Sequence, residues 1–161
     1  MILIALGANL PSPAGPPTAT LRAALARLEQ QGVKILSVSS FYETPAWPDP
    51  AQPAFVNAVA AVESTLQPVE LLTLLHGVET DFGRLRSAPN AARTLDLDLL
   101  DHAGRVMDEG VTLPHPRMHQ RSFVLAPLAE IAPDWRHPVN GRSAAELLAG
   151  LPDRDAPKKL A

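Results

Sequence analysis

Cysteine is absent from the chain, which excludes disulfide bonds, thiolate nucleophiles and cysteine-based zinc sites. Aromatic residues make up 4% of the sequence, so a buried core must consist mainly of aliphatic side chains. No apolar run approaches the length of roughly 18 residues that a membrane-spanning helix needs. The apolar start over residues 1–6 ends at Gly7 and lacks the basic flank of a signal peptide. We therefore expect a cytoplasmic protein with no membrane partner.

A strong excess of positive charge is also lacking. The formal net charge is −3, so we expect no nucleic-acid partner. The 161 residues, 46% of them apolar and 19% charged, are typical of one globular domain, which we expect to span residues 1–161. Proline is abundant, with 17 residues, and predicts several rigid loops because its ring fixes φ and removes a hydrogen-bond donor.

The hydrophobic periodicity alternates between that of strands and that of helices. The predicted elements are a strand over 2–6, a helix capped by Thr18 and ended by Gly32, a strand over 33–42, a stiff loop over 44–53, a strand over 55–62, a helix from Pro68 to Gly83, a polar loop over 84–92 and a strand over 94–100. Two further helices are expected near 121–131 and 144–151. The order β-α-β-β-α-β predicts an α+β fold with a ferredoxin-like core, in which helices flank an antiparallel sheet.

Two aspartates alternate with leucines in the last predicted strand. Because side chains alternate along a strand, Asp96 and Asp98 share one face, with Cα atoms about 6–7 Å apart. At an effective dielectric constant near 20, their charges repel by about 2–3 kcal/mol. Mg²⁺ prefers oxygen ligands and would remove this repulsion. The alternative is a solvent-exposed strand face on which the two aspartates bind no ligand, although Asp is depleted in strands.

Arginines cluster between residues 84 and 121. The cluster consists of Arg84, Arg86, Arg93, Arg117 and Arg121. The sequence has no glycine-rich Walker loop, so a bound phosphate would be neutralised by arginine, whose planar fork suits phosphate oxygens. The alternative for Arg84 and Arg86 is that they only keep a loop soluble.

Two further segments contain candidate binding residues. His115 lies between Pro114 and Pro116 on a rigid backbone, where it either donates to a phosphate or serves as a hydrogen-bonded structural residue. The loop over 44–53 leads to Phe55, which can hold a flat heterocycle, and to Asn57, whose amide can read a donor–acceptor edge. The alternative is that Phe55 belongs to the core and Asn57 lies at a strand edge.

Taken together, these segments resemble one known family along nearly the whole chain. The matching stretches are Ala5-Leu6-Gly7-Ala8-Asn9-Leu10; Ser39-Ser40-Phe41-Tyr42-Glu43-Thr44-Pro45; Gln52-Pro53 with Phe55, Asn57 and Ala58; Glu79 with Gly83-Arg84 and Arg86; Arg93-Thr94-Leu95-Asp96-Leu97-Asp98; and Pro114-His115-Pro116-Arg117 with Arg121 and Phe123-Val124-Leu125. In this order and spacing, the chain resembles the 6-hydroxymethyl-7,8-dihydropterin pyrophosphokinase family. It departs from the family at Ala91-Ala92, where a Gly-Pro pair is usual.

The resemblance implies a three-layer sandwich and the transfer of diphosphate from ATP to the hydroxymethyl group of the pterin, a reaction of folate biosynthesis. It implies two Mg²⁺ ions, ATP as co-substrate, a monomer, and no partner beyond the two small substrates. The implied site residues are Arg84 and Arg93 for catalysis; Glu79, Arg86, Thr112, His115 and Arg121 for ATP; Thr44, Pro45, Trp47, Phe55, Asn57 and Phe123 for the pterin; and Asp96 and Asp98 for the metal.

A different class of function remains open from the sequence. A non-catalytic ferredoxin-like module that senses a nucleotide or a pterin would retain Phe55 and Asn57. Such a module would not need Asp96, Asp98 and Arg93 together, so their joint presence favours catalysis.

Overall fold

A six-stranded antiparallel sheet forms the centre of the computed structural model, which describes residues 1–46, 50–84, 93–152 and 156–160. The strands are β1 (Ile2–Ala8), β2 (Lys34–Val38), β3 (Tyr42–Thr44), β4 (Phe55–Glu63), β5 (Asp96–His102) and β8 (Lys158–Lys159). Their order is β5-β1-β4-β3-β8, and β2 pairs with the other half of β4. The two central strands, β1 and β4, are buried almost throughout, as their apolar sequences predict.

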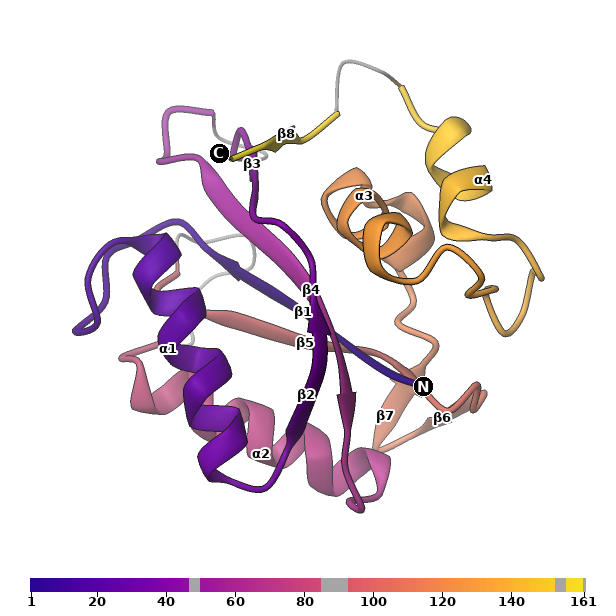
Figure 1. Cartoon of the computed structure of the whole chain (residues 1–161), viewed down its shortest axis with the longest axis horizontal. Helices are drawn as coiled ribbons and strands as arrows, with labels where there is room; N and C mark the ends of the chain where they lie inside the picture. The colour runs from indigo at the N-terminus through magenta and orange to yellow at the C-terminus, as the bar shows by residue number, and fades with distance from the viewer. Residues whose placement is uncertain (47–49, 85–92, 153–155, 161) are drawn as a thin grey trace.

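Helices cover both faces of this sheet (Figure 1). On one face lie α1 (Pro17–Gln30) and α2 (Pro68–Asp81), and on the other lie α3 (Ser122–Ile131) and α4 (Ala144–Ala149). The first core contains Ile4, Leu6, Leu21, Leu71 and Leu75, and the second contains Leu3, Val59, Leu100, Leu125 and Leu128. Alternate residues of β1 thus enter opposite cores, and the predicted α+β fold with an antiparallel sheet is confirmed.

Both long helices begin with a proline in the first turn, where its missing N–H group is not needed. Helix α2 starts at Pro68 as predicted, and Gln67 and Glu70 form a capping box there. Gly83 follows the helix at φ +83°, a conformation that glycine adopts without strain. The prediction that Thr18 caps α1 is wrong, because the cap position is Pro16 and Thr18 lies inside the helix.

The strand predicted over 33–42 is interrupted. It divides into β2 and β3 because the hydroxyl of Ser39 replaces a backbone acceptor and takes the hydrogen bond from the Val59 N–H at 3.0 Å. The last core strand begins at Asp96, not at residue 94. A short hairpin of β6 (Met107–Glu109) and β7 (Val111–Leu113) is not predicted from the sequence, because its strands are too short to show a period.

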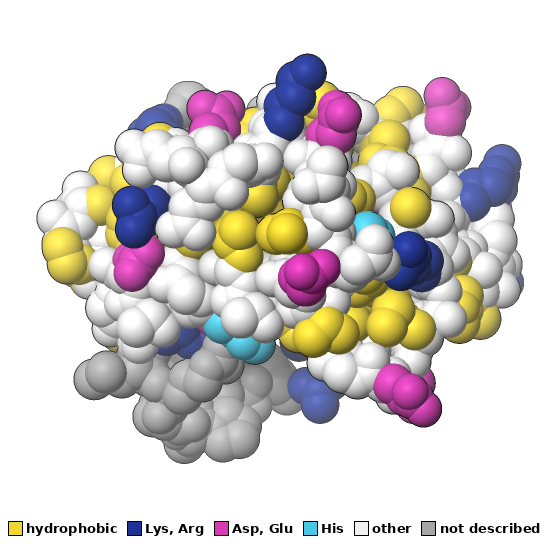
Figure 2. Space-filling view, turned by 90° about the horizontal axis from the view of Figure 1, so that it is seen from below, with side chains coloured by type: hydrophobic (Ala, Val, Ile, Leu, Met, Phe, Trp, Pro, Cys, Tyr) yellow, Lys and Arg dark blue, Asp and Glu magenta, His cyan; other side chains and the backbone are white. Residues whose placement is uncertain are grey.

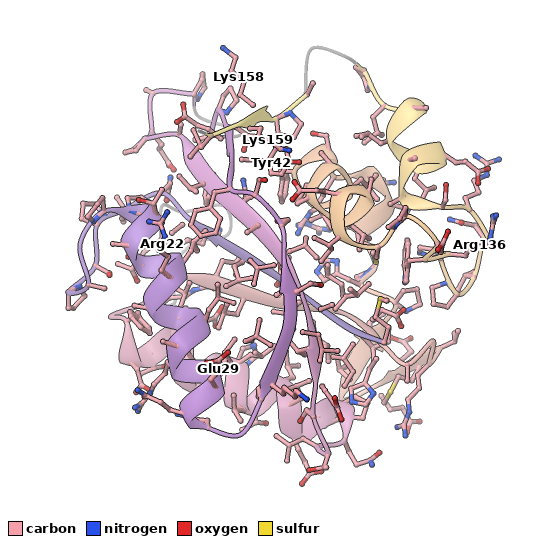
Figure 3. All side chains as sticks on the ribbon, in the orientation of Figure 1. Arg22, Glu29, Tyr42, Arg136, Lys158 and Lys159 are labelled. Carbon is pink, nitrogen blue, oxygen red and sulfur yellow. The ribbon has the colours of Figure 1, made fainter. Side chains whose placement is uncertain are left out.

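The short strand β8 was also missed. It pairs with β3 at the edge of the sheet, where Tyr42 lies opposite Lys159 (Figure 3). The Tyr42 hydroxyl donates to Glu130 of α3 at 2.6 Å, and the Lys159 ammonium lies 3.6 Å from the same carboxylate. Burial and the neighbouring Glu130 raise the pKa of Tyr42 to about 12. These contacts connect the sheet edge to α3.

The surface carries charges of both signs. On the face shown in Figure 2, acidic and basic side chains of the described residues are interspersed with hydrophobic ones. Among the residues that the structure describes, no helix combines the length and the apolar character needed to cross a bilayer.

Candidate active site

Gly7 of β1 lies at the centre of the candidate site. It pairs with Asn57 of β4 on one side and with Asp96 of β5 on the other. A Cβ atom at this position would lie 2.8 Å from the Asn57 side-chain oxygen, so any larger residue would displace it. The register therefore brings a predicted pterin residue and a predicted metal residue to opposite sides of one glycine.

These residues line a small pocket on the face of the sheet that α3 covers. The pocket has a volume of about 20 Å³ and is lined by Ala5, Leu6, Gly7, Asn57, Asp96, Asp98 and Phe123. Asp98 pairs with Ala5 in the sheet, one step further along the same face. Both aspartates thus lie on one face of β5, as the alternation of the sequence predicts, while Leu95, Leu97 and Leu99 enter the opposite core.

Guanidinium groups from separate segments converge on the two aspartates. Asp96 accepts from Arg84 at 2.7 Å with one oxygen and from Arg93 at 3.2 Å with the other. The Arg121 guanidinium lies 3.6 Å from Asp98. All of these side chains keep between 14% and 29% of their surface exposed, so a ligand can reach them. The carboxylates and arginines neutralise one another here.

Glu79 is more deeply buried than the two aspartates. Its side chain is 2% exposed and lies beneath Arg84, from which it accepts a hydrogen bond at 2.6 Å. The same carboxylate oxygen accepts from the Leu97 N–H at 2.8 Å. Glu79 therefore joins α2 to Arg84 and to β5, and its role in ATP binding stays a prediction.

The environment of Asp98 fits a divalent cation. Burial, followed by the neighbouring charge of Asp96, raises the pKa of Asp98 to about 6, although Arg121, Arg93 and Arg84 oppose the shift. A bound cation would relieve this excess of negative charge. Within the described residues no group of three or more His, Cys, Asp or Glu side chains is placed to hold a metal. A Mg²⁺ ion at Asp96 and Asp98 would therefore take its other ligands from phosphate and water.

Of the predicted pterin residues, Asn57 and Phe123 line the same pocket, and Thr44 and Phe55 pair with each other in the sheet beside Asn57. Asn57 donates from its amide nitrogen to the Thr44 hydroxyl at 3.1 Å, and both side chains are buried. Pro45 directly follows Thr44 at the end of β3. The guanidinium carbon of Arg93 lies 5.9 Å from the centre of the Phe55 ring, and that of Arg121 lies 5.5 Å from the Phe123 ring. These cation–π contacts connect the aromatic residues to the charged residues.

His115 is held by hydrogen bonds to the surrounding backbone. Its backbone N–H donates to the Leu100 carbonyl at 2.9 Å, and its ring nitrogen Nδ1 accepts from the backbone N–H of Arg117 at 3.2 Å. Burial, and then the positive charge of Arg121, lower the pKa of His115 to about 4. The neutral ring thus carries its proton on Nε2, which remains available to donate to a phosphate oxygen.

The shifted pKa of His115 predicts a pH dependence of stability. Because the pKa in the folded state, about 4, lies below the unfolded value of 6.5, folding disfavours the protonated ring. The free energy of unfolding should fall as the pH drops from about 6.5 toward 4, by roughly 1–2 kcal/mol once solvent exposure of the ring is considered. In His115→Gln this loss should disappear, as measured by urea unfolding at several pH values. Parallel pH profiles of wild type and His115→Gln, with the exposed His76→Gln as control, would contradict the assignment.

Thr112 lies on the β6–β7 hairpin, away from Gly7. Its hydroxyl donates to Asp108 at 2.9 Å. With His115 it lines a cleft of about 530 Å³, which also includes Val106, Met107, Asp108, Leu113, Pro114, Pro116, His119, His137 and Val139. The predicted roles of Thr112 and His115 in binding ATP therefore stay predictions. Trp47 and Arg86, assigned to the pterin and to ATP, lie outside the described residues.

One residue of the site was missed by the sequence analysis. Asn9 follows β1, is 1% exposed, and bonds to the backbone of Pro53 and Arg93. The sequence does contain a signal for it, because Asn9 comes directly after an apolar strand that includes Gly7. An Asn in this place can be buried and use its amide to form hydrogen bonds at the end of the strand. What it contacts depends on segments far away in the chain.

Carboxylates and arginines clustered in this way suit the class of enzymes that act on phosphorylated substrates. A family model described as 7,8-dihydro-6-hydroxymethylpterin-pyrophosphokinase matches residues 3–133. The chain belongs to this family, so the recognition from sequence is confirmed, and it is a pyrophosphokinase, an ATP-dependent diphosphotransferase.

Several curated relatives are named 2-amino-4-hydroxy-6-hydroxymethyldihydropteridine pyrophosphokinase. One from Synechocystis sp. is 39% identical over 148 residues, covering 91% of this chain and 73% of the relative. Another, from Pseudomonas aeruginosa, is 40% identical over 153 residues, covering 94% and 91%.

A solved structure with a similar fold is the HPPK-DHPS of Plasmodium falciparum. It matches with a TM-score of 0.72 at 14% identity, covering 92% of this chain. This chain spans 40% of the length of that protein, and the likeness concerns the fold alone.

Proposed function

We propose that this protein transfers the diphosphoryl group of ATP to the hydroxymethyl group of 6-hydroxymethyl-7,8-dihydropterin, with AMP as the other product, in folate biosynthesis. The observation that carries the proposal is the juxtaposition across Gly7. On one side lie Asp96 and its arginines, and on the other lies the buried amide of Asn57. A phosphate subsite and a heterocycle subsite thus meet on one face of the sheet.

The charged residues act on the phosphates. The substrate hydroxyl attacks the β-phosphorus of ATP, and AMP leaves. Two Mg²⁺ ions at Asp96 and Asp98 would neutralise the phosphates and align the reacting oxygens when bound. Arg84 and Arg93 donate to Asp96, and with a cation held by the carboxylates their guanidinium groups would be available to phosphate oxygens. They then stabilise the charge that grows in the transition state. Arg121 and the neutral His115 contribute further donors.

The pterin subsite recognises a planar, amide-bearing ring. Phe55 and Phe123 provide aromatic faces, each of which now lies against a guanidinium group. Asn57 donates to Thr44 and retains a carbonyl oxygen beside Gly7 that can accept a hydrogen bond from the pterin edge. Since Arg93 contacts both Phe55 and Asp96, the pterin ring and the phosphate group adjoin.

We also propose that the fold is a three-layer sandwich with a ferredoxin-like core. The order β5-β1-β4-β2, with α1 and α2 on one face, corresponds to a ferredoxin-like core, and α3 and α4 form the third layer. We expect a cytoplasmic monomer of one domain whose partners are the two small substrates.

The test is a direct assay. Protein incubated with ATP, Mg²⁺ and the reduced pterin should release AMP in proportion to pterin diphosphate, and EDTA should stop the reaction. Asn57→Ala should raise the KM for the pterin roughly tenfold or more, because a buried hydrogen-bonding group is lost. Binding of ATP or pterin without AMP formation would instead support the sensing module.

A further inference from the structure

We propose that Asn9 is a positioning residue that couples the two substrate subsites through its side-chain amide. The proposal rests on the proposed function, because it takes Arg93 to act on phosphate and Phe55 to act on the pterin. The side chain of Asn9 belongs to neither subsite. It bonds to the backbone of both.

The amide of Asn9 uses both of its ends. Its oxygen accepts from the Arg93 N–H at 2.8 Å, and its nitrogen donates to the Pro53 carbonyl at 3.1 Å. The backbone N–H groups of Asn9 and Leu10 donate to the Arg93 carbonyl at 3.1 and 3.2 Å. Both polar groups of the Arg93 backbone are therefore fixed to the end of β1, although 84 positions separate Asn9 from Arg93.

These bonds belong to a closed ring of contacts between Asn9, Pro53, Phe55 and Arg93. Asn9 bonds to Pro53, which lies two residues before Phe55 in the chain. The Phe55 ring lies under the Arg93 guanidinium at 5.9 Å, and the Arg93 backbone bonds to Asn9. If Phe55 shifts when a pterin binds, Arg93 is affected both by the direct ring contact and by the hydrogen bonds through the Asn9 amide.

Asparagine fits this position for a specific reason. At 1% exposure neither end of the amide can be satisfied by bulk water, so an unmade bond would carry the full cost of desolvation. Only a primary amide offers one acceptor and two donors in a short, planar group. Aspartate retains the acceptor for Arg93 but has no donor for Pro53, and alanine retains neither.

This difference gives a two-variant test. Asn9→Asp should raise the KM for the pterin about tenfold while kcat stays within about threefold, because a carboxylate oxygen then faces the Pro53 carbonyl while the acceptor for the Arg93 N–H remains. Asn9→Ala should raise that KM similarly and also lower kcat by about 10- to 100-fold, since the Arg93 N–H loses its acceptor and only the Arg93 carbonyl stays bonded to the end of β1. Asn140→Asp and Asn140→Ala serve as matched controls, because the exposed Asn140 side chain also accepts from a backbone N–H, that of Arg142 at 2.9 Å.

A second measurement separates positioning from folding. The affinity for the pterin is measured with and without a non-hydrolysable ATP analogue and Mg²⁺, alongside the Tm of each variant. We expect the analogue to enhance pterin affinity in the wild type and in the Asn140 variants, and this enhancement to fall several-fold in Asn9→Ala. If Asn9→Asp and Asn9→Ala lower only the Tm and leave KM, kcat and the enhancement unchanged, Asn9 is merely structural and the proposal is wrong.

The proposed function fails by a different result. Arg93→Ala and Asn57→Ala, measured in parallel, should each impair catalysis. If these two variants behave as wild type, the site assignment itself is wrong. If they are impaired while the Asn9 variants are not, the inference about Asn9 alone is overturned.

Discussion

Asp96→Asn and Asp98→Asn should each lower kcat by about 1,000-fold or more, because a divalent cation contributes several kcal/mol to such a transfer. Asn keeps the size of Asp but removes the charge that a hard cation requires. The two carboxylates keep 24% and 29% of their surface exposed beside the pocket, so the protein should still fold and the loss should come from chemistry. Steady-state assays with varied Mg²⁺ measure the effect.

The two variants should differ in stability. Asp96 accepts from Arg84 and Arg93, so its replacement weakens two charged hydrogen bonds, although Arg84 keeps Glu79, and should lower the free energy of unfolding by about 1–3 kcal/mol. Asp98 has a longer ion pair, 3.6 Å to Arg121, and burial raises its pKa. Asp98→Asn should therefore be neutral or slightly stabilising without metal.

A matched control is Asp81→Asn. Asp81 forms an exposed ion pair with Arg27 at 3.1 Å, and such surface pairs contribute little. It should leave both kcat and stability nearly unchanged. Turnover close to that of the wild type in Asp96→Asn and Asp98→Asn would rule out the two-carboxylate site.

The elements that the sequence predicts well are those with a long, regular pattern. Strand β4 was expected over 55–62 and spans Phe55–Glu63, and α2 begins at Pro68 as expected. In both cases local signals, a continuous apolar run or a proline before an apolar stripe, agree with the tertiary packing. The division of β2 from β3 depends instead on Ser39 bonding to Val59, 20 positions away. No window of local sequence contains that contact.

The same limit applies to the site. The shared face of Asp96 and Asp98 follows from alternation alone. The meeting of Asp96 and Asn57 across Gly7 requires the register of three strands, which is set by pairing between distant segments. Glu79 could be assigned to a nucleotide-binding site by resemblance, but its burial beneath Arg84 depends on how α2 packs against β5. The chemical groups can thus be read from the sequence, whereas packing decides which of them lie together and which are buried.

Glu79→Ala should be the most destabilising single change in the site. The Glu79 carboxylate is 2% exposed and accepts from Arg84 at 2.6 Å and from the Leu97 N–H at 2.8 Å. Its removal takes a buried charged partner from Arg84, which keeps Asp96, and leaves the buried Leu97 N–H without this acceptor, a loss of about 3–5 kcal/mol. For a chain of this length that corresponds to a fall in Tm of roughly 10 °C. Because Arg84 also loses its anchor, kcat should fall about 100-fold.

The isosteric variant separates two roles for Glu79. Glu79→Gln keeps an oxygen that can accept from Arg84 or Leu97, so its Tm should fall less, by about a third of the effect of Glu79→Ala. If the side chain acts on the nucleotide through Arg84, as we propose, Glu79→Gln should lower kcat and Tm together while the Kd for a non-hydrolysable ATP analogue changes less than about threefold. Glu70→Gln, on the exposed start of the same helix, is the control and should change neither. A large rise in that Kd with an unchanged Tm would show instead that Glu79 contacts the nucleotide directly.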